Sequence, residues 1–184
     1  MTPGVAIAVF GSSQTKPGTP EWATAEGVGS RLAMNGLTVI TGGYSGTMEA
    51  ASKGAASTGG PVIGVTAPAL FTGRTGANSY VTTELEADTL SDRLGLLTSK
   101  AAGVIVLPGS IGTATEFLLA WNINHIARRN TGVRLPTVAV GADWRELSRL
   151  LTERLGANGV DVHVVDTADM AVDWLLDQPE IRRV

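Results

Sequence analysis

The stretch Val104–Glu116, VIVLPGSIGTATE, decides the fold class of this 184-residue chain. Its first four residues, Val104–Leu107, are all apolar, which is typical of a parallel strand that is buried on both faces. Pro108 ends this strand, because proline has no N–H group to donate to a neighbouring strand. The stretch therefore predicts an inner strand of an α/β sheet.

A short loop and a helix follow this strand. Gly109 and Gly112 predict a tight loop, and Thr113 is the predicted start of a helix that carries Glu116 in its first turn. The free N–H groups and the positive dipole end at a helix start favour a bound anion, most naturally phosphate. Thr113-x-x-Glu116 is equally a capping box, in which both side chains only satisfy backbone donors. Taken alone, these residues leave phosphate binding and structural capping open.

Two earlier stretches repeat this order. Val5–Phe10 is an apolar strand followed by the polar turn Gly11–Gln14, and Leu37–Ile40 runs into the glycine-rich loop Thr41–Thr47. Ligands of open α/β sheets bind beyond the carboxyl ends of the strands, where the strand order reverses. We therefore expect these two loops and Pro108–Thr113 to build one cleft.

The rest of the chain alternates strands and helices. The predicted helices cover residues 19–35, 47–58, 89–102, 113–130, 144–155 and 168–176, and the further strands cover 61–65, 80–83, 136–140 and 162–165. Such alternation implies right-handed crossovers and a mostly parallel sheet. We predict an α/β fold with a doubly wound sheet, helices on both faces and one domain over residues 1–184.

The composition narrows the function classes. The chain is 43% hydrophobic and 17% charged with 23 glycines, which suits a compact α/β protein, and its net charge of −3 does not favour nucleic acid or anionic membranes. The absence of cysteine excludes disulfides, thiolate metal sites and cysteine nucleophiles. Met1–Phe10 lacks a basic segment and its apolar run is too short for a signal peptide. No apolar stretch is long enough to span a membrane, so we expect a cytoplasmic protein.

Several cofactor chemistries find no support. The first turn is not G-x-G-x-x-G, which argues against NAD, and the P-loop pattern is absent. His125 and His163 have no partner at metal-ligand spacing, so we interpret them as structural or surface residues and expect no metal site. The lysines are at positions 16, 53 and 100, outside any loop suited to a Schiff base. We predict no cofactor.

Arginine and carboxylate groups remain as candidates. Arg93 lies near the start of the predicted helix over residues 89–102, where the dipole does not favour a positive charge. Either a ligand or a salt bridge with Asp88 or Asp92 explains it, and the salt bridge is the simpler interpretation.

Two further segments predict a cover for the site and a contact with a partner subunit. Residues 66–79 form a long irregular loop of a kind that often covers a site. The helix after Thr113 is apolar nearly all round, which predicts that the sheet covers one side and a partner subunit another. We therefore expect at least a homodimer.

The motifs together resemble a known family. Pro108–Glu116 is similar to the P-G-G-x-G-T-x-x-E signature of the Lonely-guy (LOG) family. This family, long mislabelled as lysine decarboxylases, includes cytokinin riboside 5′-monophosphate phosphoribohydrolases. Val9–Ser13, Gly42–Met48 and Gly59–Val65 match further segments in the same order, and Arg93 falls at the arginine of the family's M-x-x-R-K motif. The resemblance covers most of the chain.

The resemblance implies a Rossmann-like fold, a dimer and hydrolysis of the N-glycosidic bond of a nucleoside 5′-monophosphate such as AMP or a cytokinin nucleotide. It implies that Glu116 is the catalytic carboxylate beside the ribose and that Arg93 is its catalytic partner. The residues expected to bind phosphate or nucleotide are Gly109, Ser110, Ile111, Gly112, Thr113, Gly42, Gly43, Gly46, Ser12 and Ser13.

The sequence also departs from this pattern. Ser110 replaces the second glycine of P-G-G, Leu94 replaces the lysine of R-K, Thr41 replaces a glycine of the second loop, and Glu49 replaces the glycine that follows the methionine. The T-G-G-Y-x-G-x-M-E-A form resembles a divergent branch related to molybdenum-cofactor carrier proteins, which bind a phosphorylated pterin. A binding or carrier protein for a phosphorylated ligand is therefore the alternative function.

Overall fold

The computed structural model describes residues 4–73, 76–130 and 132–182. Residues 1–3 of the N-terminal stretch and residues 74–75 of the predicted 66–79 loop lie outside the described residues. In the part that the structure describes, no helix is both long and apolar enough to cross a membrane.

Seven strands form one sheet in the order β4-β3-β2-β1-β5-β6-β7, and every neighbouring pair is parallel. The strands are β1 (Ala6–Phe10), β2 (Thr38–Thr41), β3 (Val62–Thr66), β4 (Thr83–Glu86), β5 (Gly103–Val106), β6 (Thr137–Val140) and β7 (His163–Val165). The chain builds outward from β1 to β4 and then returns to the other side of β1 with β5. The order therefore reverses between β1 and β5, at the centre of the sheet.

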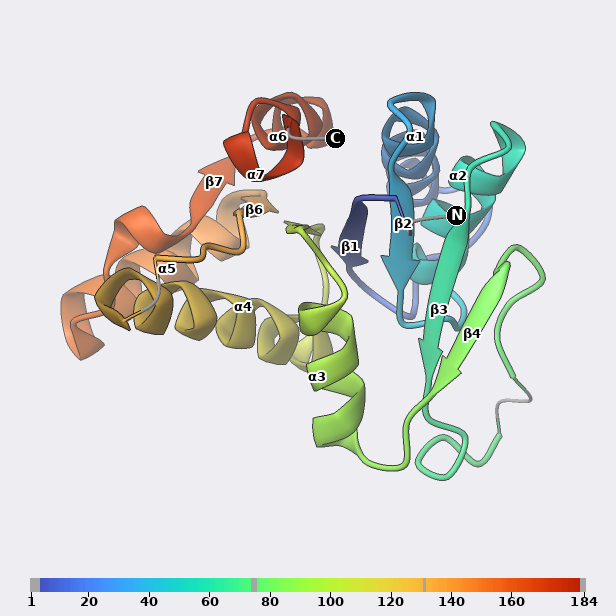
Figure 1. Cartoon of the computed structure of the whole chain (residues 1–184), viewed down its shortest axis with the longest axis horizontal. Helices are drawn as coiled ribbons and strands as arrows, with labels where there is room; N and C mark the ends of the chain where they lie inside the picture. Colours follow the sequence, from blue (N-terminus) through green and yellow to red (C-terminus); the bar gives the residue numbers. More distant parts are fainter. Residues whose placement is uncertain (1–3, 74–75, 131, 183–184) are drawn as a thin grey trace.

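The helices lie on both faces of this sheet (Figure 1). They are α1 (Pro20–Met34), α2 (Thr47–Ser57), α3 (Leu90–Ser99), α4 (Ile111–Asn130), α5 (Ala142–Leu155), α6 (Ala168–Leu176) and the short α7 (Pro179–Arg182), with a 3-10 turn at Gly159–Asp161. The predicted doubly wound α/β fold is confirmed.

The buried side chains form two hydrophobic cores, one on each face of the sheet. Strand β1 divides its side chains between them, because alternate residues of a strand point to opposite faces. Ile7 and Val9 pack with α1, α2 and α6, whereas Phe10 packs with α3, α4 and α5. All five residues of β1 are buried, as the uninterrupted apolar run predicts.

The capping signals place α1 correctly. Thr19 accepts a hydrogen bond from the Trp22 N–H (3.2 Å), Pro20 occupies the first turn, and Gly36 follows the helix with φ +75°. That left-handed conformation is open to glycine at no steric cost, so the predicted stop at this position is confirmed.

The strand predicted at residues 80–83 is wrong by three residues, since β4 covers Thr83–Glu86. Val81 closes a turn by donating its N–H to the Asn78 carbonyl (3.1 Å), and Thr82 binds Val62 through its backbone and side chain. The β-branched residues are used for this turn, and acidic residues form the edge strand, where charge discourages further pairing.

Helix α3 and the last elements also differ from expectation. Helix α3 ends at Ser99, three residues before the predicted end, with Lys100 as its C-cap. The 3-10 turn at Gly159–Asp161 and α7 are not predicted from the sequence, because both are too short for a periodic pattern.

Candidate active site

The three predicted loops meet at the carboxyl edge of the sheet, beside the point where the strand order reverses. The Ser12 N–H donates to the Pro108 carbonyl (3.2 Å), and the Thr47 N–H donates to the Ser12 carbonyl (2.8 Å). The loop after β1 is therefore bonded to the loops after β5 and β2. This is the location at which open α/β sheets bind ligands.

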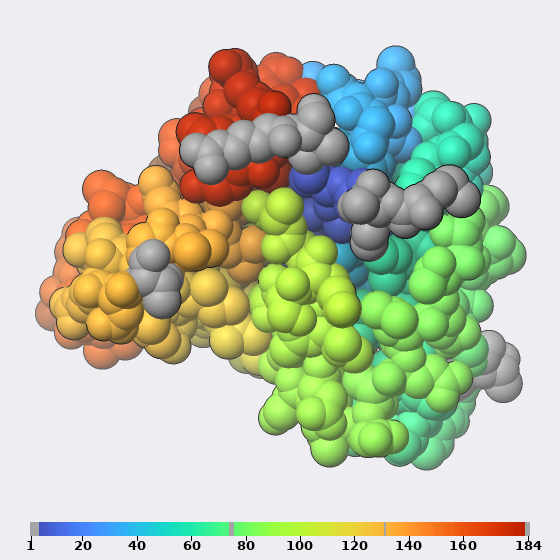
Figure 2. All heavy atoms as spheres, in the orientation of Figure 1, coloured from blue at the N-terminus to red at the C-terminus, as the bar shows by residue number. Residues whose placement is uncertain are grey.

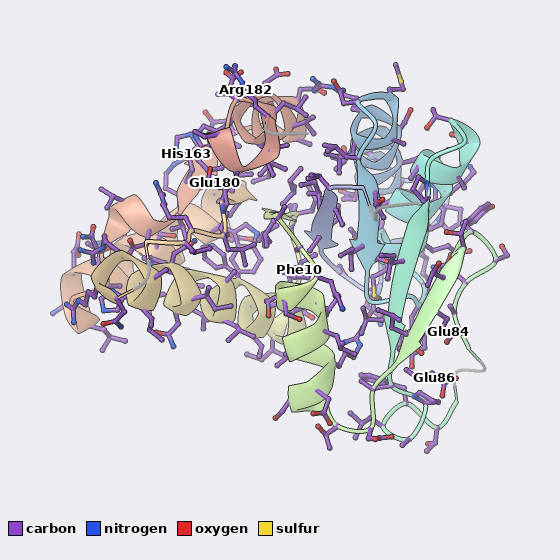
Figure 3. The ribbon with its side chains drawn as sticks, in the orientation of Figure 1. Phe10, Glu84, Glu86, His163, Glu180 and Arg182 are labelled. Carbon is purple, nitrogen blue, oxygen red and sulfur yellow. The ribbon has the colours of Figure 1, made fainter. Side chains whose placement is uncertain are left out.

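A cavity opens among these loops. Of the residues proposed from sequence, the cavity is lined by Ser13, Gly42, Arg93, Ser110, Gly112, Thr113 and Glu116. It is also lined by Val9, Phe10, Gly11, Met48 and Phe71. Phe10 marks the place in Figure 3, where its label stands in the middle of the molecule. Arg93 and Glu116 are the charged groups among these described lining residues, so one positive and one acidic side chain face the same space.

The other proposed residues lie around this cavity. Ser12 and Gly109 line an adjoining depression with Lys16, and Ile111 is 83% exposed beside a hollow between α4 and α5. Gly43 and Gly46 shape the loop after β2, with φ of +77° and +78°. Both glycines have a positive φ, a backbone conformation that glycine adopts without strain, so their role is to shape the loop.

Helix α4 begins earlier than the sequence indicates. The Ala114 N–H donates to the Ser110 carbonyl (2.9 Å) and the helix runs from Ile111, so Thr113 lies inside the first turn. The predicted capping box is wrong, and Glu116 follows the first turn instead of belonging to it. The N–H groups of Ile111, Gly112 and Thr113 have no partner within the helix, because the first turn lacks preceding carbonyls.

Glu116 places a carboxyl group in the cavity. Burial raises the pKa of Glu116 to about 7, and the positive charge of Arg93 acts against that rise. Desolvation disfavours the charged form of a carboxyl group, so the group changes charge near neutral pH. A carboxyl group tuned in this way can accept or donate a proton under physiological conditions.

Arg93 is buried, with 6% of the residue exposed. Its Nε donates to the Val65 carbonyl (2.9 Å) and its Nη2 donates to the Gly42 carbonyl (2.9 Å). Asp92 binds the Thr89 hydroxyl (2.5 Å) at the start of α3. The guanidinium thus lies among strand-end carbonyls at the cavity wall, and not at the helix start.

Two glycines are required for this arrangement. A Cβ atom at Gly42 would lie 2.0 Å from Arg93 Nη2 and 2.6 Å from Met48 Sδ. A Cβ atom at Gly109 would lie 2.2 Å from Thr113 Oγ1, so the loop after β5 folds directly onto α4. A larger residue at Gly42 would displace the Arg93 or Met48 side chain, and a larger residue at Gly109 would push the loop away from Thr113.

Sequence reasoning missed the apolar part of the wall. Phe71 comes from the 66–79 loop, which the sequence marked as a possible cover without indicating a residue. The sequence pattern places Val9 and Phe10 in a strand, Gly11 in a turn and Met48 in a helix, and it does not indicate that they line a cavity. The position of Met48 two residues after Gly46, in a stretch that matches the family, was the available signal.

The histidines contact other parts of the fold. His163 stacks on Trp174 with ring centroids 4.9 Å apart, far from Phe10 in Figure 3. His125 Nδ1 lies 3.5 Å from Asp161, whose carboxylate Arg128 also binds at 3.0 Å. Within residues 4–73, 76–130 and 132–182, no three His, Asp or Glu side chains gather in a way that could hold a metal ion.

The chain is similar in sequence to one known family and to several known enzymes. The model of the SLOG cluster4 family matches residues 4–129. Cytokinin riboside 5′-monophosphate phosphoribohydrolase of Rhodococcoides fascians is 32% identical over 126 residues, which make up 67% of this chain and 63% of that protein. Pyrimidine/purine nucleotide 5′-monophosphate nucleosidase of Escherichia coli K12 is 28% identical over 177 residues, or 88% of this chain and 38% of that protein. The chain thus spans less than two thirds of the length of these relatives.

A solved structure extends the similarity to the whole fold. The Moco carrier protein of Chlamydomonas reinhardtii superposes with a TM-score of 0.68 over 94% of this chain and 95% of that chain, at 26% identity. These findings confirm the resemblance to the LOG family and to the carrier proteins of the same fold.

Proposed function

The chain belongs to the SLOG cluster4 family, and from the geometry of its cavity we propose that it is a nucleoside 5′-monophosphate phosphoribohydrolase. The observation that carries the proposal is the pairing of Glu116 and Arg93 in one cavity with the start of α4. The relatives named for phosphoribohydrolase and nucleosidase activity support the same reaction class.

The proposed phosphate site is the loop Gly109–Thr113. The N–H groups of the first turn of α4 and its dipole attract a dianionic phosphate, and the exposed Ser110 hydroxyl adds one more donor. Ser13 and Gly42 line the same cavity from the other two loops and complete the nucleotide site. The residues 1–184 then act as one nucleotide-binding domain.

Glu116 and Arg93 would carry the chemistry. Water attacks C1′ of the ribose, the bond from C1′ to the base nitrogen breaks, and the base leaves with the electron pair. Glu116 as a carboxylate stabilises the positive charge that develops on the ribose and accepts a proton from the attacking water. The departing base takes a proton from solvent, and Glu116 then returns its proton to solvent. Arg93 binds the ribose phosphate portion, and its positive charge favours the ionised form of Glu116 against the effect of burial. The products are ribose 5-phosphate and free base.

Base release from AMP and from isopentenyladenosine monophosphate, followed by chromatography, tests this function. Wild type is expected to release base, and Glu116→Gln and Arg93→Ala are expected to lose about 10³-fold or more in rate. Glu86→Gln is the matched control, because Glu86 lies exposed on the edge strand β4 (Figure 3). Release from adenosine as fast as from AMP would contradict the phosphate site, and no release from either nucleotide would contradict the hydrolase.

Ser110 and Leu94 favour one alternative, a binding or carrier protein for a phosphorylated ligand such as the molybdenum cofactor. Ser110 places a side chain where the family pattern has glycine, and Leu94 removes a lysine next to Arg93. The likeness to the Moco carrier protein supports this alternative. Tight binding of a phosphorylated ligand without base release from AMP would favour it over hydrolysis.

We also propose that the protein acts as a homodimer in the cytoplasm. Helix α4 exposes apolar side chains in the single chain, with Leu118 39% and Ile126 49% exposed. A second subunit that covers this face would remove that apolar surface from water.

A further inference from the structure

Two aromatic rings lie against the Arg93 guanidinium. The guanidinium carbon is 5.7 Å from the centre of the Tyr44 ring and 5.5 Å from the centre of the Phe71 ring. The two rings also contact each other edge to face, with centroids 5.4 Å apart and an angle of 70° between their planes. Such cation–aromatic contacts stabilise a desolvated guanidinium in one place.

The rings come from distant parts of the chain that the structure ties together. The Tyr44 hydroxyl accepts a hydrogen bond from the Ala67 N–H (2.8 Å), at the beginning of the loop that carries Phe71. Asn78, at the other end of that loop, donates from its side chain to the carbonyls of Gly43 (3.1 Å) and Tyr44 (3.0 Å). Both ends of the loop are therefore anchored on the glycine loop after β2. In Figure 2 the green segment that includes β4 lies beside the yellow-green α3, which carries Arg93.

These contacts restrict Arg93 from several sides. The carbonyls of Val65 and Gly42 hold Nε and Nη2, and the two rings lie against the same planar group. An arginine side chain loses rotamer entropy when it is fixed. The rings and carbonyls fix it before any ligand binds, which preorganises its charge toward the Glu116 side of the cavity.

We propose that Tyr44 and Phe71 are positioning residues, whose rings hold Arg93 in the orientation that acts on Glu116 and on the nucleotide. The inference rests on the proposed function for its catalytic part, because it adds two aromatic residues to the phosphoribohydrolase site. Phe71 acts through Arg93 and belongs to the site for that reason.

Three variants test this role. Phe71→Leu removes the ring but keeps an apolar side chain at a half-buried loop position, so it preserves the fold. Phe71→Tyr keeps the ring and is the conservative rescue. Tyr80→Leu is the matched control, because it removes a half-buried ring from the same connection between β3 and β4. Each variant is measured for kcat and KM with AMP, and the Glu116 carboxyl group is titrated by carbon NMR with Glu116→Gln for assignment.

Phe71→Leu is expected to lower kcat about tenfold with KM for AMP within about twofold of wild type. It is also expected to raise the apparent pKa of Glu116 by about 0.5 or more, because the Arg93 charge then acts from a less fixed position. Phe71→Tyr and Tyr80→Leu should match wild type in both measurements. Identical titration and kcat in Phe71→Leu and wild type would overturn the proposal.

The titration separates this proposal from the proposed function. If wild type releases no base and Phe71→Leu still moves the Glu116 titration, hydrolysis fails while the positioning of Arg93 stands. If wild type hydrolyses AMP and the titration of Phe71→Leu is unchanged, the hydrolase stands and the positioning role fails.

Discussion

Glu116→Gln is expected to stabilise the folded protein at alkaline pH. Burial raises the pKa of this carboxyl group to about 7 in the folded protein, above its ordinary value of 4.5. The folded state therefore holds this proton more tightly than the unfolded state, and its stability falls as the pH rises from about 4.5 through 7. Above pH 8 the group is ionised in both states, and the whole difference in pKa opposes folding.

The size of the effect follows from that difference. A change of one in pKa corresponds to about 1.4 kcal/mol, so ionised Glu116 destabilises the fold by about 3 kcal/mol at pH 8.5 and by less than about 1 kcal/mol at pH 5. Glutamine has nearly the same shape without the charge. For a chain of this length 1 kcal/mol moves the melting temperature by roughly 2–4 °C. Glu116→Gln should therefore melt roughly 6 °C or more above wild type at pH 8.5.

Thermal denaturation followed by circular dichroism at pH 5 and pH 8.5 measures this. Glu86→Gln serves as the control, because exposed Glu86 should give no difference at either pH. A Glu116→Gln variant that is no more stable than wild type at pH 8.5, or equally more stable at both pH values, would refute the reasoning that burial of the charge destabilises the site.

Three further predictions concern the site and the assembly. Hydrolysis of AMP should show a kcat that rises with pH through about 7, because Glu116 acts as a carboxylate and burial raises its pKa to about 7; a kcat that falls through that range would assign Glu116 the role of an acid. Gly42→Ala should lower the free energy of unfolding by about 1–3 kcal/mol in urea titration, because its Cβ atom would lie 2.0 Å from Arg93 Nη2. Gly27→Ala, which has nothing within 4 Å of the added Cβ in an exposed part of α1, should instead be up to about 1 kcal/mol more stable, and equal effects in the two variants would contradict the steric argument. Light scattering at micromolar concentration should give at least a dimer; a monomer would remove the partner assigned to the exposed face of α4.

The local pattern of the sequence determined the inner strands and the ends of α1. Continuous apolar runs such as Val5–Phe10 identify inner parallel strands, because both faces of such strands are buried. Thr19 and Gly36 mark the ends of α1 because capping depends on residues only a few positions apart. The glycine loops and Glu116 were visible for the same reason, since a short loop before a helix is a local feature.

Only the tertiary structure decided how these loops combine into a site. The placement of β5 beside β1 brings Pro108 against Ser12, 96 positions apart in the sequence, and no local pattern encodes that neighbour. Arg93 reaches Gly42 from 51 residues away, and Phe71 reaches Arg93 from a loop of irregular sequence. The charge state of Glu116 likewise depends on burial among residues from several elements, since desolvation is a property of the packed cavity and not of the helix that carries the carboxyl group.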